Sequence, residues 1–258
     1  MKDGIRVTVW NEGVHERRDE AVAKIYPEGM AKPIADFLAK QFGIASVRVS
    51  ELHDEGQGVT DEILADTDVM TWWGHCAHDE VTDENAAKVK QRVLDGMGLV
   101  VLHAGHFSKL FKGLMGTGCN LKWRDDGEKE RLWVVDPAHP IAAGIPEYLE
   151  LPETEMYGEH FDIPQPDQLV FVSWFEGGEV FRSGFTLQRG FGRMFYFRPG
   201  HEAFPTFRNE HVLKVLANGI RWLRPVIDMP FPKTHRPEPL SPISPKEFKV
   251  HNVGIVNP

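Results

Sequence analysis

Six of the twelve histidines lie just past the ends of predicted strands, where their side chains can share one site. In open α/β sheets, ligands bind in the crevice outside the carboxyl ends of the strands. Imidazole acts there as a general acid, a general base or a ligand of a transition metal. One histidine in a polar loop is unremarkable, but four strands that each deliver one to the same edge indicate a common site. The six are His15, His75, His78, His103, His106 and His201.

Residues 73–80 read Trp-Gly-His-Cys-Ala-His-Asp-Glu and carry two imidazoles three residues apart, a thiol and two carboxylates. Imidazole, thiolate and carboxylate are the ligands that zinc uses in proteins. We therefore predict that His75, His78 or His103 binds a divalent metal, with zinc as the first choice. The alternative is that the two carboxylates complement the first turn of the next helix and both histidines are solvated.

His103 stands where an apolar strand turns abruptly into a helix. Ala104 and Gly105 are small enough to allow a sharp turn that presents one side chain above the sheet, as in a nucleophile elbow. An imidazole at this position is suited to proton transfer or metal binding and is a poor long-lived nucleophile. We expect this side chain to face the loop cavity and to contribute little to packing. The alternative is a hydrogen-bonded core histidine whose loss mainly destabilises the fold.

Two later segments supply further candidates. Gly200 permits a turn that lets His201 and Glu202 meet although they are adjacent in sequence. Glu155 and Glu159 lie in an acidic segment, for which the alternative is a solvated turn.

Apolar runs alternate with helix-like segments through the first half of the chain. This alternation predicts a parallel sheet with right-handed crossovers and helices on both faces. The second half is richer in strands and ends in a helix with one apolar face. Strands are expected at residues 5–10, 45–49, 68–73, 98–103, 132–135, 169–172, 179–181 and 194–197, and helices at 29–42, 82–95, 107–115 and 210–223.

The composition is that of a globular protein, with 41% hydrophobic and 26% charged residues and a net charge of -9. The sequence offers no basic stripe for nucleic acid and no apolar run of membrane-spanning length. The two cysteines are too few for a disulfide framework, so we expect reduced thiols and a cytoplasmic protein. We expect one domain at residues 1–224. The tail at 225–258 is rich in proline and is expected to lie along the surface or along a neighbouring subunit of a homo-oligomer.

At these residues the chain resembles the trehalose-utilisation (ThuA-like) family, whose fold is that of class I glutamine amidotransferases. The resemblance covers Ile5 to Leu223 and excludes the tail. It implies a flavodoxin-like three-layer sandwich around a central, mostly parallel sheet. Its carriers are His15, the 98–105 elbow with His103, residues 139–145, the 155–157 turn, and residues 192–196 leading to Gly200 and His201.

The chain departs from the amidotransferase pattern at the elbow, where His103 stands in place of the nucleophilic cysteine. Cys76 and Cys119 lie elsewhere, so no thiolate is present there to form a glutamyl thioester. We therefore do not expect glutaminase activity.

The resemblance implies a role in carbohydrate use, on trehalose-like or keto-disaccharide substrates. We expect a metal-assisted hydrolase or isomerase in which His15, His103, Glu155 and His201 are catalytic and surround one polar cavity. Two alternatives stay open: a non-catalytic sugar-binding or regulatory protein, and a glycosidase with two carboxylates. Aromatic side chains available to stack on sugar rings are Trp72, Trp73, Trp123, Trp174 and Tyr157.

Overall fold

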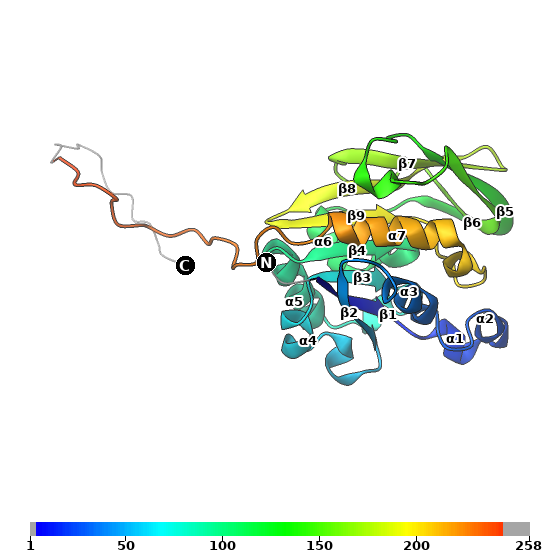
Figure 1. Cartoon of the computed structure of the whole chain (residues 1–258), viewed down its shortest axis with the longest axis horizontal. Helices are drawn as coiled ribbons and strands as arrows, with labels where there is room; N and C mark the ends of the chain where they lie inside the picture. The colour runs from blue at the N-terminus through cyan, green and yellow to red at the C-terminus, as the bar shows by residue number, and fades with distance from the viewer. Residues whose placement is uncertain (1–3, 245–258) are drawn as a thin grey trace.

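The computed structural model describes residues 4–244, which form a nine-stranded sheet covered by helices (Figure 1). The strand order is β2-β1-β3-β4-β9-β8-β7-β5-β6. The first five strands in this order pair in parallel, and the pairs from β9 to β6 are antiparallel. The strands are β1 (Ile5–Asn11), β2 (Ile44–Glu51), β3 (Val69–Trp73), β4 (Gly98–Leu102), β5 (Lys122–Val134), β6 (Tyr148–Gly158), β7 (Gln168–Phe175), β8 (Val180–Arg189) and β9 (Gly192–Phe197).

The predicted parallel core is confirmed. Val7 pairs with Val69, and Thr71 pairs with Val100, so β1, β3 and β4 are neighbours. Every residue of β3 and β4 is buried, as expected for strands covered on both faces.

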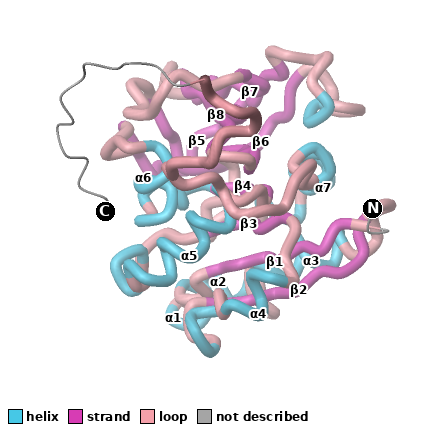
Figure 2. Tube along the Cα trace, turned by 90° about the vertical axis from the view of Figure 1, so that its left-hand side faces the viewer, coloured by secondary structure: helices cyan, strands magenta, loops and turns pink. Residues whose placement is uncertain are grey.

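Helices lie on both faces of the sheet, as the strand–helix alternation predicts. The apolar faces of α3 and α7 pack against one side, and α4, α5 and α6 pack against the other (Figure 2). Alternate residues of β4 serve the two sides, because successive side chains of a strand point to opposite faces. The helices are α1 (His15–Arg18), α2 (Glu20–Ile25), α3 (Ala31–Leu38), α4 (Asp61–Ala65), α5 (Asp83–Leu94), α6 (Lys109–Met115) and α7 (Glu210–Trp222).

Several elements differ from the sequence-based expectation. β5 and β8 are longer than the strands expected at 132–135 and 179–181, and α1, α2, α4 and β6 were not expected. The helix expected at 29–42 spans only Ala31–Leu38, because the chain turns before Gly43, whose φ is +83°, and Phe42 is 94% exposed. The segment around Glu155, expected as a turn, belongs to the 11-residue strand β6. Its pairing partner is β5, the preceding strand, which holds the acidic segment in extended conformation.

The start of the tail is anchored to the end of α5. The backbone N–H groups of Met229 and Phe231 donate to the carbonyl and the carboxylate of Asp95, and Arg92 pairs with Asp228 at 2.9 Å. Residues 232–244 are exposed and extend away from the sheet (Figure 1), and residues 245–258 lie outside the described part of the chain. In residues 4–244, no helix is both long and apolar enough to cross a bilayer.

Candidate metal-binding active site

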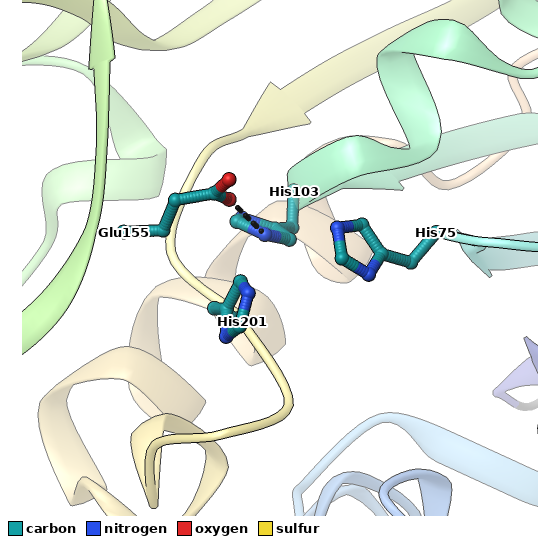
Figure 3. Close-up of side chains that lie close together, drawn as sticks. All are labelled: His75, His103, Glu155 and His201. Carbon is teal, nitrogen blue, oxygen red and sulfur yellow. Dashed lines mark ion pairs between the residues drawn. The ribbon is translucent and has the colours of Figure 1, made fainter. Parts of the chain in front are cut away.

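Four side chains from separate elements converge beyond the carboxyl ends of the central strands (Figure 3). His75 follows β3, His103 follows β4 directly, His201 follows β9, and these three strands are neighbours in the sheet. Glu155 reaches the same point from β6. Each of the four offers a ligand atom, and these atoms lie within 4.8 Å of one another.

His103 begins a 3₁₀ turn with φ at +49°, in the left-handed region that side chains other than glycine rarely adopt. Gly105 makes this turn fit, since a Cβ there would lie 3.1 Å from the Trp72 carbonyl oxygen. The structure differs from our expectation of a loop-facing imidazole, because His103 is fully buried. Its Nδ1 lies 3.0 Å from the carbonyl oxygen of Arg198, and its ring stacks on Tyr157 with 5.0 Å between centroids.

Glu12 holds the loop that carries His75. This carboxylate is 1% exposed and accepts the backbone N–H groups of His75, Cys76 and Ala77 at 2.7, 3.0 and 3.1 Å. Three charge-assisted hydrogen bonds fix the loop and with it the direction of the imidazole. Sequence reasoning missed Glu12, although its position directly after β1 is the kind of signal that identified the histidines.

Glu202 contacts the imidazole ring of His75 directly and orients it. Its Oε1 lies 3.0 Å from Nδ1 of His75 and 3.3 Å from Nδ1 of His15. Burial opposes the charge on His75, but the hydrogen bond and charge of Glu202 outweigh it and raise the pKa of this histidine. Although burial acts against it as well, the same contact lowers the pKa of Glu202 to about 2. Metal-binding imidazoles commonly donate the N–H of the ring nitrogen that does not bind the metal to a carboxylate.

The carboxylate of Glu155 and the imidazole of His103 approach each other so closely that a proton or a cation between them would stabilise the contact. Oε2 of Glu155 lies 3.0 Å from Nε2 of His103, is buried, and makes no hydrogen bond within the described residues. Nδ1 of His103 donates to a carbonyl, so Nε2 of the neutral ring presents a lone pair to the carboxylate. Burial raises the pKa of Glu155 and lowers that of His103 far below its usual value.

A buried ion pair helps to position both Glu155 and His103. The guanidinium of Arg198 is fully buried and pairs with Glu130, and it also donates to the backbone carbonyl of Glu155 at 2.8 Å. The carbonyl of Arg198 receives the hydrogen bond of His103. One residue therefore sets the positions of a strand end on β6 and of the elbow imidazole.

The cluster lies in the wall of a cavity of about 410 Å³. His75, Glu155, Tyr157 and His201 line it, and His103 lies directly behind them. His15, which was predicted at the cavity, is absent from its lining but contacts His75, with Nε2 3.1 Å from Nδ1 of that ring. The volume is in the range of small-molecule sites.

The other residues that the sequence suggested for the site lie outside the cluster of four, either at the cavity wall or in the core. His78 lines the cavity wall beside Phe107, but among residues 4–244 it is outside the group with mutually close ligand atoms. Trp72 stacks on Trp10 in the core, and Trp73 donates to the carbonyl of Gly200, so neither is open to a ligand.

The exposed aromatic surface of the cavity comes from Phe107 and from Trp123, which is 67% exposed. Sequence reasoning included Trp123 and Tyr157 among the aromatic candidates and missed Phe107. Asp125 adds a second carboxylate to the lining. The cavity lining therefore combines aromatic rings with two carboxylates, of which Glu155 is buried.

The fold and this cluster define an α/β protein with an amidotransferase-like sheet, in which histidine occupies the elbow. A family model described as ThuA, trehalose utilisation, matches residues 6–223, and the chain belongs to this family. No curated protein matches the chain at a significant level.

Solved structures share the fold at low sequence identity. A ThuA-like protein from Bacteroides uniformis has a TM-score of 0.63 at 16% identity, covering 86% of this chain and 93% of that one. A cytoplasmic protein from Salmonella typhimurium has a TM-score of 0.59 at 13% identity, covering 85% and 100%. PurLQS from Thermotoga maritima has a TM-score of 0.53 at 13% identity, covering 85% and 99%. These similarities confirm the predicted fold class.

Proposed function

We propose that this protein is a metal-assisted enzyme of carbohydrate use that acts on a trehalose-like or keto-disaccharide substrate. The observation that carries the proposal is the cluster of His75, His103, Glu155 and His201, whose ligand atoms lie within 4.8 Å of one another. Two or three imidazoles with one carboxylate are a common ligand set of catalytic zinc and non-haem iron sites. Membership of the ThuA family supports the class of substrate.

The buried Oε2 of Glu155, which has no hydrogen-bond partner among residues 4–244, supports a cation in preference to a proton. An uncompensated carboxylate oxygen in a buried site is costly, and a divalent ion would satisfy it together with the lone pair of His103. The supporting contacts of His75 and His103, to Glu202 and to the Arg198 carbonyl, are those that metal-binding imidazoles make. Glutaminase chemistry is not part of the proposal, because the elbow holds no thiol.

A bound divalent ion would polarise a sugar carbonyl or activate a water molecule. Trp123 and Phe107 offer exposed rings at the cavity, where the apolar face of a sugar can pack, and Asp125 offers an acceptor for its hydroxyl groups. The side chains of the chain itself would orient the substrate and hold protons. This combination fits a polar ligand of disaccharide size better than an apolar one.

The proposal is tested by incubating the protein with trehalose and with its keto derivative, before and after treatment with a chelator. We expect conversion of the keto sugar, loss of activity on chelation and recovery with added Zn²⁺ or another divalent ion. Sugar binding without conversion would favour the binding-protein alternative. Hydrolysis that is insensitive to chelators would favour the glycosidase with two carboxylates and contradict a metal mechanism.

A further inference from the structure

We propose that His201 is a hydrogen-bond donor to the metal-bound ligand and does not itself bind the metal. The proposal rests on the metal site proposed above and specifies its ligand set. His75, His103 and Glu155 are then the protein ligands, and at least one coordination position stays open. Catalytic zinc sites have this composition, with three protein ligands and one exchangeable position.

The argument begins with the hydrogen bond that His201 receives. The backbone N–H of Ala203 donates to Nδ1 of His201 at 3.2 Å. A nitrogen that accepts a hydrogen bond carries no proton, so in the neutral ring the proton is on Nε2. A protonated Nε2 has no lone pair to offer a metal ion.

The same arrangement occurs elsewhere in the chain, in a place where the second nitrogen has a partner. Nδ1 of His139 accepts the backbone N–H of Ile141 at 3.1 Å, two residues later as in His201. Nε2 of His139 lies 3.1 Å from the amide oxygen of Gln168, an acceptor, and therefore donates to it. His139 shows the protonation pattern that we assign to His201.

His75 and His103 have the opposite pattern. Their Nδ1 atoms face the Glu202 carboxylate and the Arg198 carbonyl, both acceptors, so each Nδ1 carries the proton. Nε2 of each ring therefore carries the lone pair that a metal ion needs, and in His103 the hydroxyl of Tyr157 lies 3.4 Å from this atom. Within one cluster, two imidazoles are held as ligands and the third as a donor.

The donor of His201 is aimed at the site and is uncommitted among the described residues. Nε2 lies 4.0 Å from Oδ2 of Asp125 and 3.8 Å from Oε1 of Glu202, and both separations exceed a hydrogen bond. The ring lines the cavity next to Glu155 (Figure 3). An oxygen bound at the open metal position would therefore meet a preorganised N–H group, which stabilises charge that develops on it.

The test uses Co²⁺ as the metal and acetohydroxamate, which binds metals through oxygen, as the ligand. His201→Met removes the donor at similar size, and His201→Gln retains an N–H group. His75→Gln is the matched control that removes a ligand. Co²⁺ affinity and the visible spectrum of the Co²⁺ protein report on the ligand set, and thermal unfolding checks that each variant is folded.

We expect both His201 variants to bind Co²⁺ within threefold of the wild type and with the same spectrum, while His75→Gln weakens binding at least a hundredfold. Acetohydroxamate should bind the Co²⁺ form of His201→Met about tenfold more weakly, with partial recovery in His201→Gln, since one hydrogen bond is at stake.

Three results would overturn the assignment. If His201→Met lost Co²⁺ as severely as His75→Gln, His201 would be a ligand. If Co²⁺ were retained but hydroxamate affinity did not change, the donor role would be absent. A wild-type protein that binds no Co²⁺ would contradict the proposed metal site and this assignment together, so the two failures are distinguishable.

Discussion

At the scale of single residues, His103 combines two roles that our sequence analysis treated as alternatives. It is a buried, hydrogen-bonded core residue, and its Nε2 also faces the carboxylate of Glu155. The left-handed backbone at this position is the strained turn that the elbow motif indicates. The expectation of a loop-facing imidazole that contributes little to packing was therefore wrong, and replacing this side chain should affect both stability and the proposed metal site.

His103→Ala should lower the free energy of unfolding by about 2–4 kcal/mol, because it removes a stacked, buried ring and leaves the Arg198 carbonyl unpaired. Urea unfolding of metal-free protein measures this change. His78→Ala is the control, since His78 lies at the cavity wall and makes fewer contacts. Equal stability of His103→Ala and wild type would contradict the described packing.

Cys76 should react slowly with thiol reagents although it is exposed. Partial desolvation of the sulfur, the charge of Glu12 and the hydrogen bond to Glu12 raise the pKa of Cys76 to about 12, so the thiolate fraction at pH 8 is very small. We expect reaction with iodoacetamide at pH 8 to be more than tenfold slower than that of free cysteine. Mass spectrometry of the labelled peptide gives the rate, and labelling as fast as free cysteine would contradict the contact with Glu12.

At the scale of elements, β6 is the strand on which the site depends and the one that the sequence did not reveal. It lies at the edge of the sheet, carries Glu155, and pairs with β5. The strand includes Pro152 and several charged residues, a pattern unlike that of the buried parallel strands. The end of β6 is tied to β8 through Glu159, which accepts from the guanidinium and the backbone N–H of Arg182.

This contact between the two strands should make stability sensitive to acid. Partial burial alone would raise the pKa of Glu159, but the hydrogen bonds from Arg182 outweigh it and hold the pKa below the usual 4.5. Its contribution to stability is therefore present above about pH 4.5 and is lost as the pH falls through the lowered value.

Glu159→Gln should therefore be less stable than the wild type at pH 7, and the difference should shrink toward pH 3. Urea unfolding at a series of pH values measures it. Glu153→Gln, at an exposed residue of β6, serves as the control. A difference between Glu159→Gln and wild type that stays constant from pH 7 to pH 3 would show that the charge of Glu159 is not involved.

At the scale of the whole molecule, the parallel half was predictable and the antiparallel extension was less so. Continuous apolar runs such as 98–102 identify strands buried on both faces, and the carboxyl ends of parallel strands necessarily share one edge. This geometry is why His75, His103 and His201 could be assigned to one place.

The partners of those histidines were predicted less completely. Glu155 was expected at the same cavity, but its place on a strand depends on the pairing of β6 with β5. Glu12 directly follows β1, but its contacts with the backbone N–H groups of the 75–77 loop are not visible in the sequence. Which nitrogen of each imidazole is free follows only from contacts such as that of Ala203 with His201.

The central claim is that this cavity contains a metal site, and the metal content of the protein tests it most directly. Protein purified without a histidine tag or chelator should be analysed for zinc, iron, manganese, cobalt, nickel and copper by elemental mass spectrometry. We predict close to one equivalent of a divalent transition metal per chain, which His75→Gln and Glu155→Gln should lose. Protein that contains no such metal, and binds none on titration, would contradict the account.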